Sequence, residues 1–118
     1  MPRLGETRTV SNPSGASGRE PTRDEVDGLP GPTLLEFGTS WCGHCRALAP
    51  ALASLPRAHP DVRHIKVEDG PGLPLGRSFG VKLWPTLVFL KDGRVAGQVA
   101  RPGLARVREG LDAIDPGG

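Results

Sequence analysis

The chain has 118 residues, the length of a single domain. Its 15 Lys and Arg residues nearly balance its 13 Asp and Glu residues, and a net charge of +2 argues against nucleic acid or a membrane surface as the partner. No apolar run is long enough to span a bilayer, and Met1–Val10 lacks the apolar core of a secretory signal. If the chain is complete, these features predict a cytoplasmic protein, and nothing in the sequence calls for more than a monomer.

The first residues, 1 to about 20, are rich in Gly, Pro, Ser, Thr and Arg, and beyond Met1 their only sizeable apolar side chains are Leu4 and Val10. Such a segment cannot bury enough apolar surface to offset the entropy that it loses on ordering. We therefore expect a disordered tail over residues 1–20, with a short strand at Thr7–Val10 as the alternative. One folded domain is expected over residues 21–118.

The domain is predicted to begin with a short helix and a buried strand. Thr22 and Glu25 have the spacing of a capping box, and a helix ending near Asp27 would follow them. The run Thr33–Phe37 is apolar except for Glu36, which predicts a strand buried on both faces. A carboxylate inside such a strand is costly to bury and requires a partner.

The stretch Trp41–Cys45 carries two cysteines separated by two residues, at the start of a predicted helix. Residues i and i+3 of a helix lie on one face, so both sulfurs come within disulfide-bonding reach. The free N–H groups and the dipole of a helix N-terminus stabilise a thiolate, which makes Cys42 the expected exposed nucleophile. Cys45, one turn later and less accessible, would be the resolving thiol. His44 can lend a positive charge or a hydrogen bond to the Cys42 thiolate and make the disulfide more oxidising.

Two other uses of this cysteine pair are open. The pair could be half of a zinc site, although Cys42 and Cys45 are the only cysteines and the three histidines supply no second ligand pair at finger spacing. It could also be an inert structural disulfide, although so short a loop restricts the unfolded chain little. The spacing favours redox chemistry, for which no metal is expected.

An amphipathic helix and a second strand are predicted after the cysteines. The helix has apolar residues at helical spacing, namely Leu48, Leu52 and Leu55. The run Val62–Val67 alternates in a way that predicts a strand. Lys66 on this strand is the candidate partner of Glu36, and a solvent-facing lysine is the alternative.

The C-terminal half predicts a hairpin and a last helix. One or two helical turns are expected at Leu75–Phe79, and the most apolar run, Thr86–Leu90, predicts a central strand. Lys91–Arg94 contains the Asp-Gly signal of a hairpin turn, and the strand Arg94–Ala100 that follows it is interrupted by Gly97. The last helix has an apolar stripe that we expect in the core, formed by Leu104, Val107, Leu111 and Ile114. This order of elements predicts an α/β fold with a mixed sheet flanked by helices.

Two segments of the chain resemble the thioredoxin family. The segment from Leu34 through Pro50, centred on Trp-Cys-Gly-His-Cys, resembles the active-site region of the catalytic domains of protein disulfide isomerase. The later segment Pro85–Gly93 resembles bacterial thioredoxin. The resemblance covers about Thr33–Ile114. It implies the thioredoxin fold, with a mixed sheet of four to five strands, and a thiol:disulfide oxidoreductase.

The family assigns catalytic roles to matching positions. Glu36 would be the buried acid that accepts the proton of Cys45 when this thiol attacks, and Lys66 would be its lysine partner. With Cys42 as the nucleophile and His44 as the tuning residue, these five residues form the expected catalytic set.

The family also assigns substrate contacts. Pro85 would be a cis-proline beside the disulfide that presents its backbone to an extended substrate. Trp41 would flank the site, and Gly43 and Trp84 complete the expected substrate-binding set. The bulk of Trp84, where the family has a smaller residue, could narrow the groove or provide an apolar anchor.

Three further departures from the family are visible. Gly38 stands where an aromatic is common just after the acid, and Arg101 stands where a glycine lines the substrate groove. The usual first strand is absent or very short, which favours four strands over five. These departures bear on which substrates fit the groove.

The expected function is therefore reduction or exchange of disulfides in protein or small-thiol substrates. No cofactor is expected beyond the Cys42–Cys45 disulfide itself, and a thioredoxin reductase or the glutathione system would regenerate the protein. The alternative is a thioredoxin-like interaction module in which the disulfide is vestigial and Trp41, Trp84 and Pro85 form a peptide groove.

Overall fold

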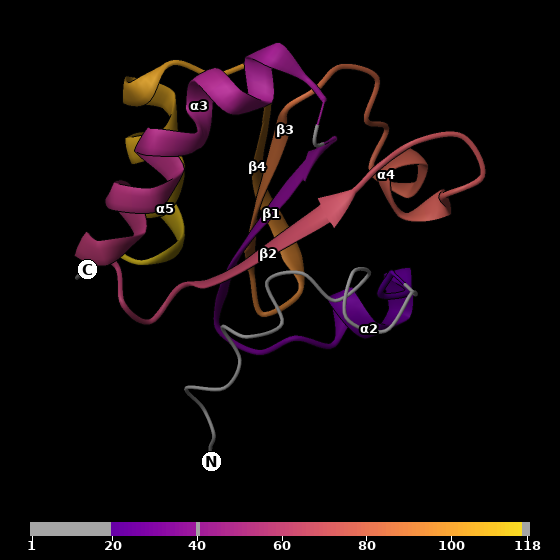
Figure 1. The fold of residues 1–118 in the computed structure, drawn as a ribbon. Coiled ribbons are helices and arrows are strands. Elements are labelled where there is room, and N and C mark those ends of the chain that lie inside the picture. The colour runs from indigo at the N-terminus through magenta and orange to yellow at the C-terminus, as the bar shows by residue number, and fades with distance from the viewer. Residues whose placement is uncertain (1–19, 40, 117–118) are drawn as a thin grey trace.

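The computed structural model of the chain describes residues 20–39 and 41–116. The predicted tail and the alternative strand at Thr7–Val10 lie outside these residues. The described elements follow the predicted order (Figure 1): α2 (Arg23–Asp27), β1 (Pro32–Gly38), α3 (Gly43–Ser54), the 3₁₀ turn η2 (Leu55–Ala58), β2 (Arg63–Glu68), α4 (Pro74–Ser78), β3 (Thr86–Lys91), β4 (Arg94–Ala100) and α5 (Leu104–Ile114).

The described strands form one mixed sheet in the order β2-β1-β3-β4. β1 pairs in parallel with β2, to which it is connected through α3, and antiparallel with β3. β3 and β4 form the predicted hairpin, and the Asp-Gly signal is confirmed because Asp92 and Gly93 have φ angles of 51° and 80°. The predicted mixed sheet is therefore confirmed, with four strands in the described part of the chain.

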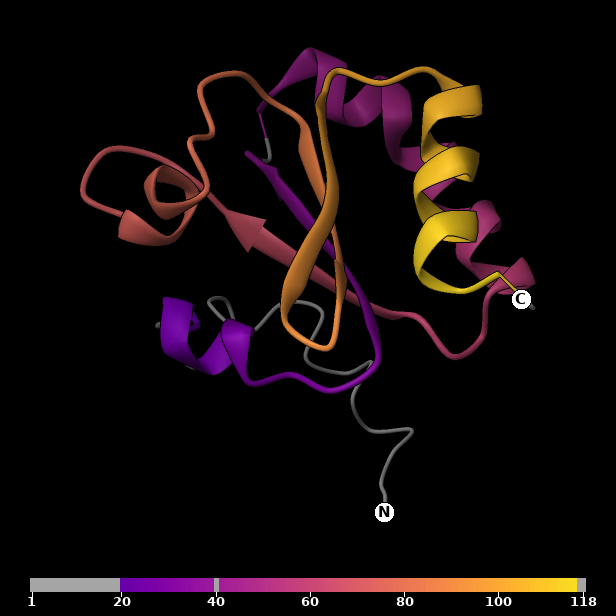
Figure 2. The same cartoon turned by 180° about the vertical axis from the view of Figure 1, so that it is seen from behind.

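Helices cover both faces of the sheet, α3 and α5 on one and α2 and α4 on the other (Figures 1 and 2). Successive side chains of a strand point to opposite faces, so β1 contributes to both layers. The cluster on the α2/α4 face consists of Val26, Leu35, Phe37, Ile65, Val67, Leu75, Phe79, Val88 and Leu90. The cluster on the α3/α5 face consists of Leu34, Leu48, Leu52, Val62, Leu87, Phe89, Val107, Leu111 and Ile114.

The predicted short helix after Thr22 is confirmed in detail. The Thr22 side chain accepts a hydrogen bond from the Glu25 N–H at 3.0 Å, and the Glu25 carboxylate accepts one from the Thr22 N–H at 2.9 Å. This capping box starts α2, and the buried Val26 holds the helix against the sheet.

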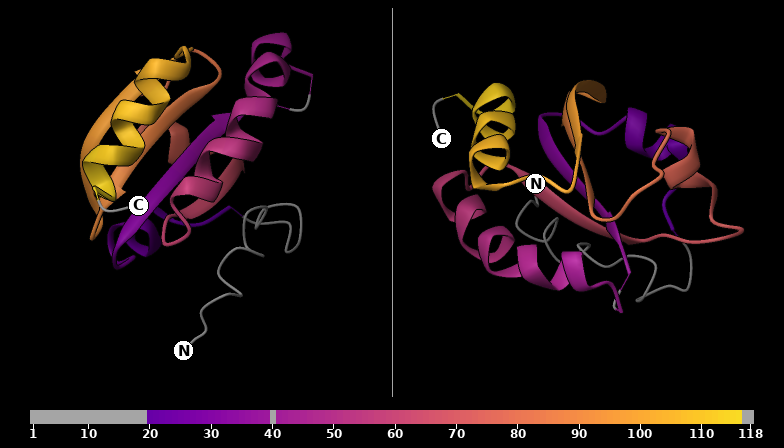
Figure 3. Two further views of the ribbon diagram at one scale, coloured as in Figure 1. Left: turned by 90° about the vertical axis from the view of Figure 1, so that its left-hand side faces the viewer. Right: turned by 90° about the horizontal axis from the view of Figure 1, so that it is seen from above.

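The last helix lies along the sheet beside α3 (Figure 3), but its predicted apolar stripe is wrong at one position. Val107, Leu111 and Ile114 are fully buried, whereas Leu104 is 51% exposed. Leu104 is the first residue of α5, one turn before the buried stripe, and it lies beside the active-site groove described below. Gly110 allows α5 to approach closely, because a side chain there would collide with the Phe89 ring.

Candidate active site

The two cysteines lie at the N-terminal end of α3, which begins directly after Cys42. Both are free thiols, and they are similarly buried, with exposed fractions of 7% for Cys42 and 9% for Cys45. The expectation of an exposed Cys42 is therefore wrong. The Cys42 sulfur turns back over the first helical turn, where it accepts a hydrogen bond from the Cys45 N–H at 3.2 Å.

This position gives Cys42 the surroundings of a stabilised thiolate. Burial by itself raises the pKa of Cys42 through desolvation. Hydrogen bonds from the Cys45 thiol and from the Cys45 and His44 N–H groups, together with the positive charge of Arg101, outweigh this effect and lower the pKa below the ordinary value. Cys42 thus acts as the N-cap of α3, with its sulfur in the place of a capping oxygen.

The second thiol is held in its protonated form. Burial raises the pKa of Cys45 to about 11, supported by its hydrogen bond to Cys42 and by the negative charges of Cys42 and Glu36. Only the Thr39 N–H, which bonds to the Cys45 sulfur, acts in the opposite direction. Gly38 provides the room, since a Cβ atom there would lie 2.6 Å from the Cys45 sulfur. The Gly38 departure therefore has a steric reason.

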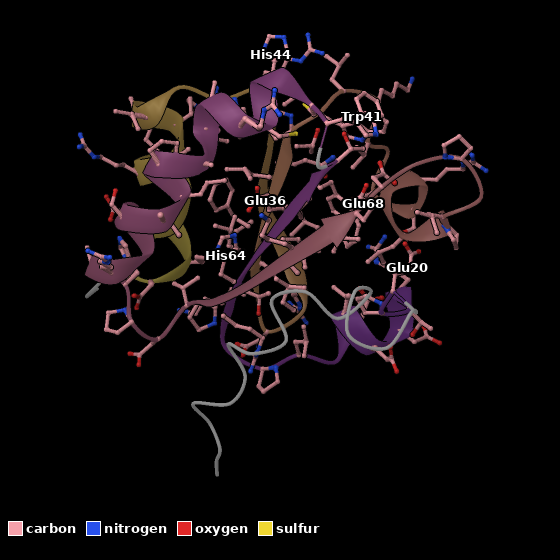
Figure 4. The ribbon with its side chains drawn as sticks, viewed as in Figure 1. Glu20, Glu36, Trp41, His44, His64 and Glu68 are labelled. Atoms are coloured by element: carbon pink, nitrogen blue, oxygen red, sulfur yellow. The ribbon has the colours of Figure 1, made fainter. Side chains whose placement is uncertain are left out.

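The predicted tuning residue acts on Cys42 through its backbone. The His44 N–H is a hydrogen-bond donor to the Cys42 sulfur. The His44 imidazole is exposed and lies at the outer end of α3 (Figure 4). A proline at this position would have no N–H to donate. The hydrogen bond anticipated from the sequence is thus made by the main chain.

Glu36 is buried as predicted, but Lys66 is not its partner, and the alternative of a solvent-facing lysine is confirmed. Glu36 and Lys66 are opposite each other in the β1/β2 ladder, yet Lys66 is exposed and forms no ion pair within the described residues. Instead, the His64 Nε2 lies 2.8 Å from the Glu36 Oε1. Figure 4 labels both side chains. β2 is an edge strand, so the long lysine chain reaches water, whereas the short imidazole of His64 stays over β1.

A cleft of about 480 Å³ leads from the surface to the inner side of Cys45. Its lining residues are Glu36, Gly38, Thr39, Cys45, Arg46, Ala49, Lys66, Val67 and Glu68. The buried Thr39 hydroxyl in this cleft has no hydrogen-bond partner among the described residues. Glu36, Lys66 and Cys45 therefore share one solvent-accessible space, although Glu36 and Lys66 are not paired.

The two tryptophans are in contact beside the cysteines. Trp41 is 69% exposed, and its ring meets the edge of Trp84 with 5.4 Å between ring centroids and an angle of 82°. The Trp84 Nε1 donates a hydrogen bond to the Asp69 carboxylate at 2.9 Å. Asp69 has room because Gly76 has no side chain, since a Cβ atom there would lie 2.6 Å from an Asp69 oxygen. Trp84 is thus oriented toward Trp41.

The peptide bond between Trp84 and Pro85 is cis, the form that the resemblance implies for this proline. Arg101 holds this segment from the end of β4. Its N–H donates to the Pro85 carbonyl at 2.7 Å, and its Nε donates to the Trp84 carbonyl at 3.0 Å. On the other side of Pro85 lies a groove of about 280 Å³, lined by His44, Ala47, Leu48, Ala51, Pro85, Arg101, Pro102, Gly103 and Leu104.

The structure therefore brings together the predicted Cys42, Cys45, His44, Glu36, Trp41, Trp84 and Pro85. Gly43 is the exposed first residue of α3, and its role in substrate binding stays a prediction. Sequence reasoning missed His64 and Asp69 as partners of site residues. Strand alternation places His64 on the same face as Glu36 and could have indicated it, whereas Asp69 follows β2 in a loop and gave no signal.

Among the described residues, no group of three or more His, Cys, Asp or Glu residues lies close enough to hold a metal ion. None of the described helices has the length and apolar character needed to cross a bilayer.

Comparison with known proteins agrees with this geometry. A family model described as thioredoxin matches residues 22–111. The solved structure of thioredoxin 2 from Pseudomonas aeruginosa PAO1 in its reduced form is 55% identical in sequence. The match covers 86% of this chain and 95% of that one, with a TM-score of 0.75. The predicted thioredoxin fold is thereby confirmed.

Curated relatives include both groups that the motif resembles. Thioredoxin from Rhodospirillum rubrum is 42% identical over 69 residues, which are 56% of this chain and 64% of that protein. Protein disulfide-isomerase A2 from Pongo abelii is 45% identical over 64 residues, which are 51% of this chain and 12% of that protein. The chain thus spans less than two thirds of the length of these relatives.

Proposed function

Because the chain belongs to the thioredoxin family, we propose that it is a thiol:disulfide oxidoreductase that uses Cys42 and Cys45 to reduce or exchange disulfides in proteins or small thiols. The observation that carries this proposal is the pairing of the two thiols at the start of α3, with the Cys45 N–H 3.2 Å from the Cys42 sulfur. Cys42 is stabilised as a thiolate, the form that attacks a disulfide, and Cys45 stays a protonated thiol until the second attack. A disulfide exchange needs both states.

In the first step, the Cys42 thiolate attacks one sulfur of the substrate disulfide. A bond forms between Cys42 and that sulfur, and the other substrate sulfur leaves as a thiolate that takes up a proton. The α3 N-terminus favours the attacking form of Cys42, as the lowered pKa supports. Pro85 and Trp41 are proposed to hold the substrate segment beside Cys42.

In the second step, Cys45 loses its proton and attacks the Cys42 sulfur. The Cys42–Cys45 disulfide forms, and the remaining substrate sulfur leaves as a second thiol. Glu36 is proposed to accept the Cys45 proton, because it lines the same cleft and is buried beside this thiol. Two electrons pass from the protein dithiol to the substrate, and the same steps reversed would oxidise a substrate dithiol.

The regenerating partner and the setting are further parts of the proposal. A thioredoxin reductase or the glutathione system would return the Cys42–Cys45 disulfide to the dithiol, with no other cofactor. We propose that the protein acts in the cytoplasm and as a monomer. Cell fractionation and light scattering of the purified protein test these two points, and metal analysis tests the zinc alternative.

The experiment that tests the function is a trapping assay with Cys45→Ser. This variant retains the nucleophile but lacks the resolving thiol, so mixed disulfides on Cys42 should accumulate with a disulfide substrate and be released by dithiothreitol. Cys42→Ser is the matched control and should form no adduct. If Cys45→Ser forms none either, the proposed mechanism is wrong. A protein that carries both Cys42→Ser and Cys45→Ser and retains its biological function would instead favour the interaction-module alternative.

A further inference from the structure

Arg101 lies at the active site and has hydrogen-bond donors that the proposed mechanism does not use. It lies just after β4 and has a φ angle of 50°, a left-handed conformation that glycine adopts with less strain. A non-glycine residue held in this conformation beside a reactive centre is reason to look for a function. The two hydrogen bonds to the carbonyls of Trp84 and Pro85 fix the arginine there.

The guanidinium group of Arg101 has N–H donors that are not used within the protein. Its Nε is bound to the Trp84 carbonyl, but its two terminal amino groups make no hydrogen bond, and it has no ion pair, within the part of the chain that the structure describes. Arg101 is exposed, so these donors face solvent. A planar guanidinium held at one edge and free at the other is suited to bind a carboxylate.

The groove that Pro85 and Arg101 line has the complementary features for a peptide segment with such a carboxylate. Its floor is apolar, with Pro85, Leu48 and the half-exposed Leu104, and its charged or titratable lining residues are Arg101 and His44. Among the described residues that line this groove, none is acidic. A negative charge on the bound segment would therefore be attracted by Arg101 without repulsion from an acidic residue of the groove.

We propose that Arg101 selects disulfide substrates in which an acidic residue flanks the reacting cysteine of a protein segment lying in this groove. The inference rests on the proposed oxidoreductase function and names its substrate class. The step itself is the exchange described above. The charge of Arg101 favours the Cys42 thiolate for every substrate, and its contact with the substrate carboxylate adds the selectivity.

The test compares two peptide disulfides that differ in charge alone. In each, a short cysteine peptide is linked to the same small neutral thiol, and both neighbours of the cysteine are Glu in one peptide and Gln in the other. The second-order rate constant for reduction by the reduced protein is measured for both. Each value is divided by the rate constant for dithiothreitol, which removes the intrinsic reactivity of each disulfide.

The native protein should prefer the Glu peptide by up to about fivefold, the upper end of what an exposed ion pair provides. Arg101→Gln should reduce both peptides at nearly equal normalised rates, and Arg101→Glu should prefer the Gln peptide. Any general change in the reactivity of Cys42 affects both peptides and cancels in the ratio. Arg94→Gln removes an exposed arginine from the far end of the hairpin and should leave the preference unchanged.

Equal normalised rates with the native protein, or a preference that persists in both Arg101 variants, would overturn the substrate assignment while leaving the oxidoreductase function intact. Failure to reduce either peptide would overturn the proposed function itself. The preference should also fall as salt is raised from low to physiological concentration, because exposed charges are screened. A preference independent of salt would contradict an ionic contact with Arg101.

Discussion

The α2/α4 face of the sheet buries its apolar cluster, from Val26 to Leu90, beside the Thr33 hydroxyl, which accepts a hydrogen bond from the half-buried Arg63 at 3.0 Å. The α3/α5 face instead interrupts its apolar cluster with a buried carboxylate, Glu36, paired with His64. Both layers come from alternate residues of the same strands. A buried carboxylate and imidazole cost desolvation energy that an apolar pair does not. The polar pair lies on the face that also holds the cysteines, so its position indicates chemistry, while the apolar face supports the fold.

The largest effect is expected from removing packing on the apolar face. Leu90 is fully buried there, at the end of β3 away from Pro85. Leu90→Ala should lower the free energy of unfolding by about 2–5 kcal/mol, because it leaves a cavity in the core. Urea unfolding measures this loss. The rate of disulfide reduction per folded molecule should stay unchanged, and a reduced rate would show that this face also takes part in the reaction.

The two thiols should differ by about a hundredfold or more in reactivity toward an alkylating reagent near neutral pH. Cys42 has a pKa lowered from the ordinary 9.0, so its thiolate fraction there exceeds that of an ordinary thiol, whereas Cys45, with a pKa of about 11, becomes a thiolate only in alkali. Mass spectrometry after brief iodoacetamide treatment should find one label, on Cys42. Equal labelling of both thiols would contradict the assigned nucleophile.

Replacing the polar pair on the α3/α5 face with apolar residues should slow the reaction without lowering the stability of the fold. The double variant Glu36→Leu with His64→Leu should slow the decay of the Cys42 mixed disulfide by about a hundredfold, because the Cys45 proton loses its acceptor. The free energy of unfolding should be unchanged or higher by about 1–4 kcal/mol. Rapid quenching measures the decay, and urea unfolding measures the stability.

A matched control uses His59, which is a buried histidine. His59 lies 3.1 Å from the Asp115 carboxylate and 3.4 Å from that of Asp112, where α5 ends. His59→Leu with Asp115→Leu replaces a similar pair, neither member of which lines the cleft at Cys45. It should not change the decay of the mixed disulfide. A similar slowing in both double variants would mean that the effect comes from general loss of structure.

The smallest effect separates the backbone of residue 44 from its side chain. His44→Pro removes the N–H that bonds to the Cys42 sulfur and should lower the reduction potential by about 30 mV, equivalent to a tenfold change in the equilibrium constant. His44→Ala keeps the N–H and should change the potential less. Equal shifts in the two variants would assign the tuning to the imidazole.

Much of the fold follows from local signals in the sequence. The Thr22/Glu25 capping box, the buried runs that became β1 and β3, and the Asp-Gly turn each act over a few residues, and each is confirmed. The prediction that Leu104 lies in the core was wrong, since its side chain is exposed. Helical spacing identifies an apolar stripe but does not show where the sheet beneath the helix ends.

The candidate site was less predictable, because its contacts join distant segments. Cys42 and Cys45 are recognisable from spacing alone, but the partner of Glu36 depends on how far each side chain of β2 reaches, which selected His64 over Lys66. The burial of Cys42 follows from the direction of its sulfur over the helix turn, a detail that sequence spacing does not contain.

The most direct measurement is the reduction potential of the Cys42 and Cys45 pair, obtained by equilibration with reduced and oxidised glutathione and mass-spectrometric counting of free thiols. We expect a reversible two-electron transition in which both thiols disappear together. Its potential should lie above the roughly −270 mV of thioredoxin, because N–H groups and Arg101 stabilise the Cys42 thiolate. A pair that forms no disulfide at any glutathione ratio would contradict the central claim that this site exchanges disulfides.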